Sequence, residues 1–201
     1  VTQGYDSPPR KIRNSEMEDR KMTINREDTI AVFIDFQEKL MPAMSRKEEL
    51  EDKTCRLAQG LKVLGIPHIV TQQYTKGIGE TIPSIAEAIG EFTPIDKTTF
   101  SCMGHVDFVN QLEIISKPNV IVCGIEAHIC VQQTVEQLLK EGYRVYVAAD
   151  CCSSRSQSDY MWATERMEKA GAIMTTYESI LYELLKDSRS EVFRYISKIV
   201  K

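Results

Sequence analysis

Three residues of the kinds used in covalent catalysis each follow an apolar stretch of this chain. Asp35 closes the first stretch, Lys97 follows another, and Cys130 comes six residues after Gly124, which ends a third. A cysteine thiolate is a nucleophile, a carboxylate can take the thiol proton, and a nearby cation can stabilise the negative charge. These residue types could carry out nucleophilic chemistry if the fold brings them together.

The elements that must position these residues alternate along the chain. Apolar runs typical of buried strands alternate with stretches of helical spacing, several of which end at glycine. Strands are expected at 29–35, 68–71, 93–96, 119–124, 143–149 and 172–176, and helices at 46–64, 83–89, 105–115, 128–141, 158–170 and 178–200. The pattern predicts an α/β fold with three layers, doubly wound, in which helices cover both faces of a six-stranded parallel sheet.

In open sheets of this kind, ligands bind beyond the carboxyl ends of the strands. Asp35, Lys97 and Cys130 all follow strands, so we expect them to converge there. The start of the helix at Cys130 and the cation of Lys97 are both expected to lower the pKa of the thiol. The residues alone leave the alternatives open that Cys130 is a buried structural cysteine and that Asp35 caps a helix or holds a turn.

The composition of the chain indicates how it is organised and which classes of partner to expect. Residues 1–28 are polar and are expected to form an N-terminal arm, followed by one domain over 29–201. The net charge of −4 gives no reason to expect nucleic acid as a partner, and no apolar run approaches the length of a membrane span. The six cysteines lack the spacing of a zinc site and are expected to be reduced thiols in a cytoplasmic protein.

Four segments resemble the motifs of the isochorismatase-like cysteine hydrolases. The family's motifs are a strand ending in D-x-Q, a K-x-x-[FY]-[SD] loop, a G-x-x-x-x-x-C-V nucleophile segment and a stretch after the fifth strand. The segments that resemble them are, in the same order, Val32-Phe-Ile-Asp-Phe-Gln37, Asp96-Lys-Thr-Thr-Phe-Ser101, Val122-Cys-Gly-Ile-Glu-Ala-His-Ile-Cys-Val131 and Ala148 to Ser156. The resemblance runs from about 29 to 186 and includes the Rossmann-like order of the sheet. It is strongest to isochorismatase-domain-containing proteins of unassigned substrate.

The resemblance implies a catalytic triad of Asp35, Lys97 and Cys130. It also implies a non-proline cis peptide at Ile125-Glu126, whose expected use is to direct N–H groups at one point as an oxyanion hole. The implied activity is hydrolysis of a small amide or related substrate through a covalent intermediate on Cys130. Members of this family are commonly oligomeric, so a homo-oligomer is expected.

Substrate contacts and cofactors follow from the residues beside the triad. Gln37, Gln73, Tyr74 and Phe100 each follow a strand next to it and are the candidate substrate-binding residues. Nicotinamidase-like members carry a metal site with an Asp-x-His motif, but the corresponding stretch here, 71–77, holds neither histidine nor carboxylate. We therefore expect a small-molecule substrate, no metal and no cofactor.

Two other functions remain open for the same residues. A thiol redox protein could use Cys130 together with Cys151 and Cys152, which follow the neighbouring strand in the predicted order. A member that binds a small molecule without turnover is the second alternative. Retention of all three triad residues favours the hydrolase.

Overall fold

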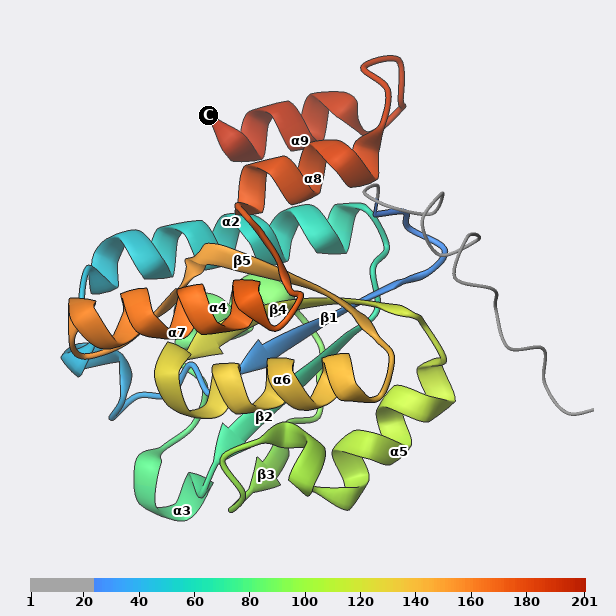
Figure 1. The fold of residues 1–201 in the computed structure, drawn as a ribbon. Coiled ribbons are helices and arrows are strands. Elements are labelled where there is room, and N and C mark those ends of the chain that lie inside the picture. Colours follow the sequence, from blue (N-terminus) through green and yellow to red (C-terminus); the bar gives the residue numbers. More distant parts are fainter. Residues whose placement is uncertain (1–23) are drawn as a thin grey trace, which may run out of the picture.

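The central element of the fold is a parallel sheet of six strands. The computed structural model describes residues 24–201, and within this range the strands lie in the order β3-β2-β1-β4-β5-β6, with every neighbouring pair parallel (Figure 1). The strands are β1 (Thr29–Ile34), β2 (His68–Gln73), β3 (Ile95–Lys97), β4 (Asn119–Ile125), β5 (Arg144–Ser153) and β6 (Ile173–Thr175). The predicted six-stranded parallel sheet is confirmed.

Helices cover both faces of the sheet (Figure 1). On one face lie α2 (Lys47–Val63), α4 (Pro83–Ile89), α8 (Tyr177–Leu185) and α9 (Phe193–Val200), and on the other lie α5 (Val106–Ile115), α6 (Gln132–Lys140) and α7 (Gln157–Lys169). Shorter elements complete the connections: η1 (Met41–Ala43), α3 (Thr75–Ile78), η2 (Cys102–Gly104) and η3 (Ala127–Val131). The three layers and the double winding agree with the prediction.

The continuous apolar pattern of the central strands follows from burial on both faces. All six residues of β1 and all seven of β4 are buried, as expected for strands covered by helices on each side. These two strands are neighbours, yet the chain leaves β1 toward β2 and leaves β4 toward β5, in opposite directions across the sheet. The resulting switch point is the place where open α/β sheets bind their ligands.

Two strands continue by two or more residues past their predicted ends. β2 continues to Gln73, and β5 continues through Cys151 and Cys152 to Ser153. The extension of β5 depends on an irregularity in its pairing with β4, which shifts register between Val122 and Gly124. Cys151 and Cys152 therefore lie within a buried strand, and the prediction that they follow its end is wrong.

The predicted N-terminal arm falls largely outside the described residues, which begin at 24. Its last part packs onto the domain before β1 begins. Ile24 is fully buried, Arg26 Nε donates a hydrogen bond to the Leu184 carbonyl (2.9 Å), and the Asp28 carbonyl accepts one from Asn119 N–H (3.0 Å). Across residues 24–201, no helix has both the length and the apolar character needed to cross a membrane.

Candidate active site

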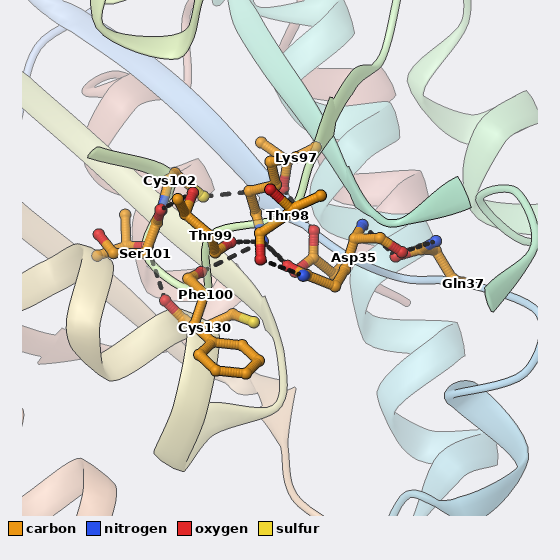
Figure 2. Close-up of polar contacts among 12 residues, drawn as sticks. Asp35, Gln37, Lys97, Thr98, Thr99, Phe100, Ser101, Cys102 and Cys130 are labelled. Carbon is orange, nitrogen blue, oxygen red and sulfur yellow. Dashed lines mark hydrogen bonds and ion pairs between the residues drawn. The ribbon is translucent and has the colours of Figure 1, made fainter. Parts of the chain in front are cut away.

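The fold brings Asp35, Lys97 and Cys130 to the carboxyl edge of the sheet (Figure 2). Asp35 directly follows β1, Cys130 follows the adjacent β4, and Lys97 is the last residue of β3. β3 lies two strands from β1, so the long lysine side chain spans the intervening β2. Asp35 and Lys97 are fully buried, and Cys130 is 6% exposed.

Asp35 and Lys97 form a buried ion pair. Lys97 Nζ lies 2.7 Å from Asp35 Oδ2 and 2.7 Å from Gln73 Oε1, and the carbonyls of Thr99 and Phe100 each accept from it at 3.2 Å. Burial by itself would lower the pKa of Lys97, but the Asp35 carboxylate together with the neighbouring Cys102 and Cys130 outweighs this effect, and the pKa is raised. The side chain is therefore a fixed cation enclosed by acceptors.

The backbone at Asp35 turns sharply at the end of β1. Asp35 has a φ of 54°, in the left-handed region that aspartate tolerates better than most residues. Its N–H donates to the Thr71 carbonyl (3.2 Å), and its own carbonyl accepts from Gln37 N–H (2.7 Å). The turn directs the carboxylate into the sheet edge, where Oδ1 accepts a hydrogen bond from the Thr71 hydroxyl (2.7 Å).

Cys130 lies in an element that the sequence did not reveal. Instead of starting an α-helix, it sits in η3, a turn of π-helix that precedes α6, and the N–H groups of Ile129 and Val131 both donate to the Glu126 carbonyl (3.0 and 3.3 Å). Insertions of this kind occur often at functional sites.

The expected lowering of the Cys130 pKa is wrong. Burial and the adjacent Asp35 carboxylate raise the pKa of the thiol well above its ordinary value, and the opposing influence of Lys97 is too small to reverse this. A thiol with a raised pKa keeps its proton at neutral pH, and the Asp35 carboxylate lies next to it.

The peptide bond between Ile125 and Glu126 is cis, at the position that the family resemblance implied. The Glu126 side chain is buried, and its Oε2 accepts hydrogen bonds from the N–H and the Nε of Arg155, both at 3.0 Å. These contacts join the segment before Cys130 to the loop after β5.

The four predicted substrate-binding residues occupy different environments. The side-chain amide of Gln37 is fully buried, donates to the carbonyls of Gln73 (3.0 Å) and Gly79 (2.6 Å), and accepts from Gln73 N–H (2.6 Å). This geometry favours an anchoring role for Gln37 over the predicted substrate contact. Gln73 contacts Lys97 directly, whereas Tyr74 and Phe100 are 52% and 56% exposed and lie at the surface beside the triad.

Sequence reasoning missed three buried residues beside the triad, two of which contact it directly. Thr71 contacts Asp35, and the hydroxyl of Thr134 donates to the Cys130 carbonyl (2.6 Å). Cys102 contacts both threonines. Thr71 lies near the carboxyl end of β2, so the rule that singled out Asp35 could have found it, but nothing in the sequence singles out Cys102 or Thr134.

The described residues include all the cysteines and most of the other side chains that could bind a metal ion. All six cysteines are free thiols. Residues 24–201 contain no cluster of three or more histidine, cysteine, aspartate or glutamate side chains suited to holding a metal ion.

Comparison with known proteins places these features in a family. The Isochorismatase domain matches residues 29–179. Isochorismatase domain-containing protein 2 of Danio rerio is 36% identical over 174 residues, which cover 86% of each chain. Isochorismatase domain-containing protein 1 of Salmo salar is 38% identical over 173 residues, covering 86% of this chain but 61% of the longer relative. The chain thus spans less than two thirds of that relative.

Solved structures share the same architecture. The MAR1 ribonuclease of Caenorhabditis elegans is 39% identical, with a TM-score of 0.84, over 89% of this chain and 92% of that one. The YcaC gene product of Escherichia coli, described as an octameric hydrolase of unknown specificity, has a TM-score of 0.84 over 88% of each chain. It is 20% identical, a likeness that extends to the fold alone.

Proposed function

The chain belongs to the isochorismatase family of hydrolases, and from this premise we propose that it cleaves a small amide or related substrate through a covalent intermediate on Cys130. The observation that carries the proposal is the burial of Asp35 and Lys97 in one ion pair beside the Cys130 thiol. A carboxylate held next to a protonated thiol is the arrangement that general-base activation of a nucleophile requires.

The first half of the reaction forms an acyl-enzyme. Asp35 takes the proton from Cys130 Sγ as the sulfur bonds to the substrate carbonyl carbon, and the carbonyl electron pair moves onto oxygen. Collapse of this intermediate breaks the bond from carbon to the leaving nitrogen, which receives the proton from Asp35. The products are a thioester on Cys130 and a free amine.

The second half releases the acid. Asp35 takes a proton from water as the water oxygen attacks the thioester carbon, and the sulfur leaves and regains that proton. Lys97 keeps its charge throughout and balances the carboxylate whenever that group is ionised. The N–H groups of Glu126 and Cys130 are the proposed donors to the oxyanion, and the exposed rings of Tyr74 and Phe100 are the proposed substrate contacts.

The raised pKa of Cys130 suits this order of events. A thiol that is neutral in the free protein resists adventitious alkylation and oxidation, because the thiolate is the reactive form. Proton transfer to Asp35 then coincides with attack on the substrate. The same property argues against the thiol redox alternative, as do Cys151 and Cys152, which are buried within β5.

The test combines a substrate screen with trapping of the intermediate. We would assay small amides and esters with the wild-type protein, with Cys130→Ala, and with Cys55→Ala as a matched control at a half-buried thiol. Cys130→Ala should abolish turnover and Cys55→Ala should retain it. Intact-mass spectrometry should detect the acyl adduct on Cys130 in the wild type. Full hydrolysis by Cys130→Ala would refute the proposal.

The name of one relative raises a second candidate. Because the Caenorhabditis elegans protein is described as a ribonuclease and is 39% identical, RNA oligonucleotides belong in the same screen. The only cation of the triad is fully buried and already contacts four acceptors, so it offers little to a phosphate backbone. If the wild-type protein cleaves RNA and Cys130→Ala does not, RNA replaces the small amide as the proposed substrate.

The assembly and the cellular location of the chain are two further proposals. We propose a homo-oligomer of this chain, in keeping with the octamer described for the Escherichia coli protein, and a cytoplasmic location. Analytical ultracentrifugation of the purified chain tests the proposed homo-oligomer, and a monomer at micromolar concentration would contradict it.

A further inference from the structure

We propose that Thr71, Cys102 and Thr134 are positioning residues that hold the Asp35 carboxylate and the Cys130 nucleophile in register, with Cys102 as the donor common to both. This inference rests on the proposed function, because it assigns a task to residues that touch the proposed base and nucleophile. All three are fully buried. They lie on three separate elements: β2, η2 and α6.

The first arm of this network runs to the base. Thr71 lies next to Ile34 in the sheet, one residue before Asp35, and its hydroxyl is 2.7 Å from Asp35 Oδ1. An ionised carboxylate can only accept, so the hydroxyl hydrogen must point toward Asp35. The hydroxyl lone pairs then face Cys102 Sγ at 3.8 Å, a contact drawn as the dashed line from the Cys102 sulfur in Figure 2.

The second arm runs to the nucleophile. The Thr134 hydroxyl, one turn after Cys130, donates to the Cys130 carbonyl at 2.6 Å. The same hydroxyl accepts from the backbone N–H of Cys102 at 3.0 Å. In both arms, therefore, a threonine hydroxyl accepts from Cys102 and donates to a triad residue. A displacement of the 97–102 loop would disturb the base and the nucleophile together.

Cys102 can fill this role because its thiol keeps its hydrogen. Burial raises the pKa of Cys102 to about 11, against the opposing influence of Lys97. A protonated thiol is a donor, and a fully buried one is a poor target for reagents. The geometry assigns Cys102 to hydrogen bonding and leaves Cys130, with its small exposed surface, as the reacting thiol.

The simpler explanation is that these three residues only fill the core. The two explanations differ for Thr71→Val, which keeps the shape and removes the hydroxyl. If Thr71 only packs, the reactivity of Cys130 should not change. If it polarises Asp35, the variant carboxylate loses a donor that disperses its negative charge. The carboxylate then disfavours a neighbouring thiolate more strongly, so that the pKa of Cys130 rises and less thiolate forms at a given pH.

The experiment measures the rate of Cys130 alkylation at pH 8, with the labelled residue identified by mass spectrometry. Iodoacetamide and N-ethylmaleimide are used in parallel, because a change in access alters the ratio of the two rates, whereas a change in thiolate fraction lowers both equally. Thr71→Val should slow both about tenfold, the effect of one pKa unit and of the order expected for loss of a hydrogen bond to a charged group.

Two variants complete the comparison. Thr71→Ser restores the hydroxyl and should return the rate to near the wild-type value. Thr54→Val is the matched control: Thr54 is equally buried but lies on α2, on the opposite face of the sheet from α6 (Figure 1). It should leave Cys130 labelling unchanged.

A folded Thr71→Val protein that labels within twofold of wild type would overturn the proposal. If Thr71→Val does not fold, two variants of Cys102 test the proposal instead. Cys102→Ala should slow the labelling of Cys130, and Cys102→Ser should not. Equal labelling rates in these two variants would overturn the proposal. Labelling needs no substrate, so a substrate screen that fails leaves this result standing. Conversely, unchanged labelling in Thr71→Val would leave the role proposed for Cys130 in hydrolysis intact.

Discussion

Replacement of Lys97 by methionine should expose how strongly the site depends on its buried ion pair. Both partners are fully buried, and their charged atoms are 2.7 Å apart. Lys97→Met retains the length and apolar stem of the side chain but leaves the Asp35 carboxylate without its cation. Removal of one partner from a buried pair costs about 3–5 kcal/mol, because the remaining charge is uncompensated.

The loss would be a large part of the total stability. Single domains typically have unfolding free energies of about 5–15 kcal/mol, and for a domain of this size each kcal/mol shifts the melting temperature by roughly 2–4 °C. Lys97→Met should therefore melt about 6–20 °C below wild type. Urea unfolding at pH 7, followed by circular dichroism, measures the same difference as a free energy.

The double variant separates the charge from the packing. Asp35→Asn combined with Lys97→Met removes both charges, and neutral replacement of a buried pair is often close to neutral for stability. We expect the double variant to lose less unfolding free energy, by about 2 kcal/mol or more, than the sum of the losses in the two single variants. A loss below about 1 kcal/mol in Lys97→Met, or strictly additive losses in the double variant, would refute this account of the pair.

Three further predictions concern stability elsewhere in the fold. Gly124→Ala should cost several kcal/mol, since a Cβ there would lie 2.5 Å from backbone and side-chain atoms of Ile34. Gly142 also has a positive φ but lies in open space, so Gly142→Ala should cost only about 1 kcal/mol, and urea unfolding of both variants compares them. Gln37→Ala should cost about 2–4 kcal/mol in the same assay, because it removes three buried hydrogen bonds that tie β2 and the following loop to the turn after β1; a loss below 1 kcal/mol would contradict the anchoring role. The free energy of unfolding should fall as pH rises from 9 to 11, because the raised pKa of Cys102 contributes stability that is present below the ordinary thiol value of 9.0 and is lost as pH rises toward about 11. The contribution is on the order of 3 kcal/mol. Cys102→Ala should show a shallower decline, and parallel curves for the two proteins would show that Cys102 has no part in it.

The strand ends that carry Asp35, Lys97 and Cys130 were predictable because the signals for them are local. The apolar run of β1 and the acid that closes it are adjacent in the chain, and parallel strands must end at one edge of the sheet. The rule placed Asp35, Lys97 and Cys130 at one edge of the sheet, although it could give neither the distances nor which strands are neighbours. The hydrogen bonds of the Gln37 side chain could not be predicted, because its partners at positions 73 and 79 are far from it in sequence.

The sequence by itself determined the class of the fold, the number of strands, the family and the three residues that could do chemistry, because strand periodicity, turn residues and motif spacing are properties of short segments. Only the tertiary structure decided the state of Cys130. Its pKa reflects burial by several elements, the Asp35 carboxylate that follows β1 and the Lys97 ammonium from β3. These opposing contributions depend on distance and solvent exposure, which no local pattern encodes, and their sum raises the pKa of the thiol beside the carboxylate.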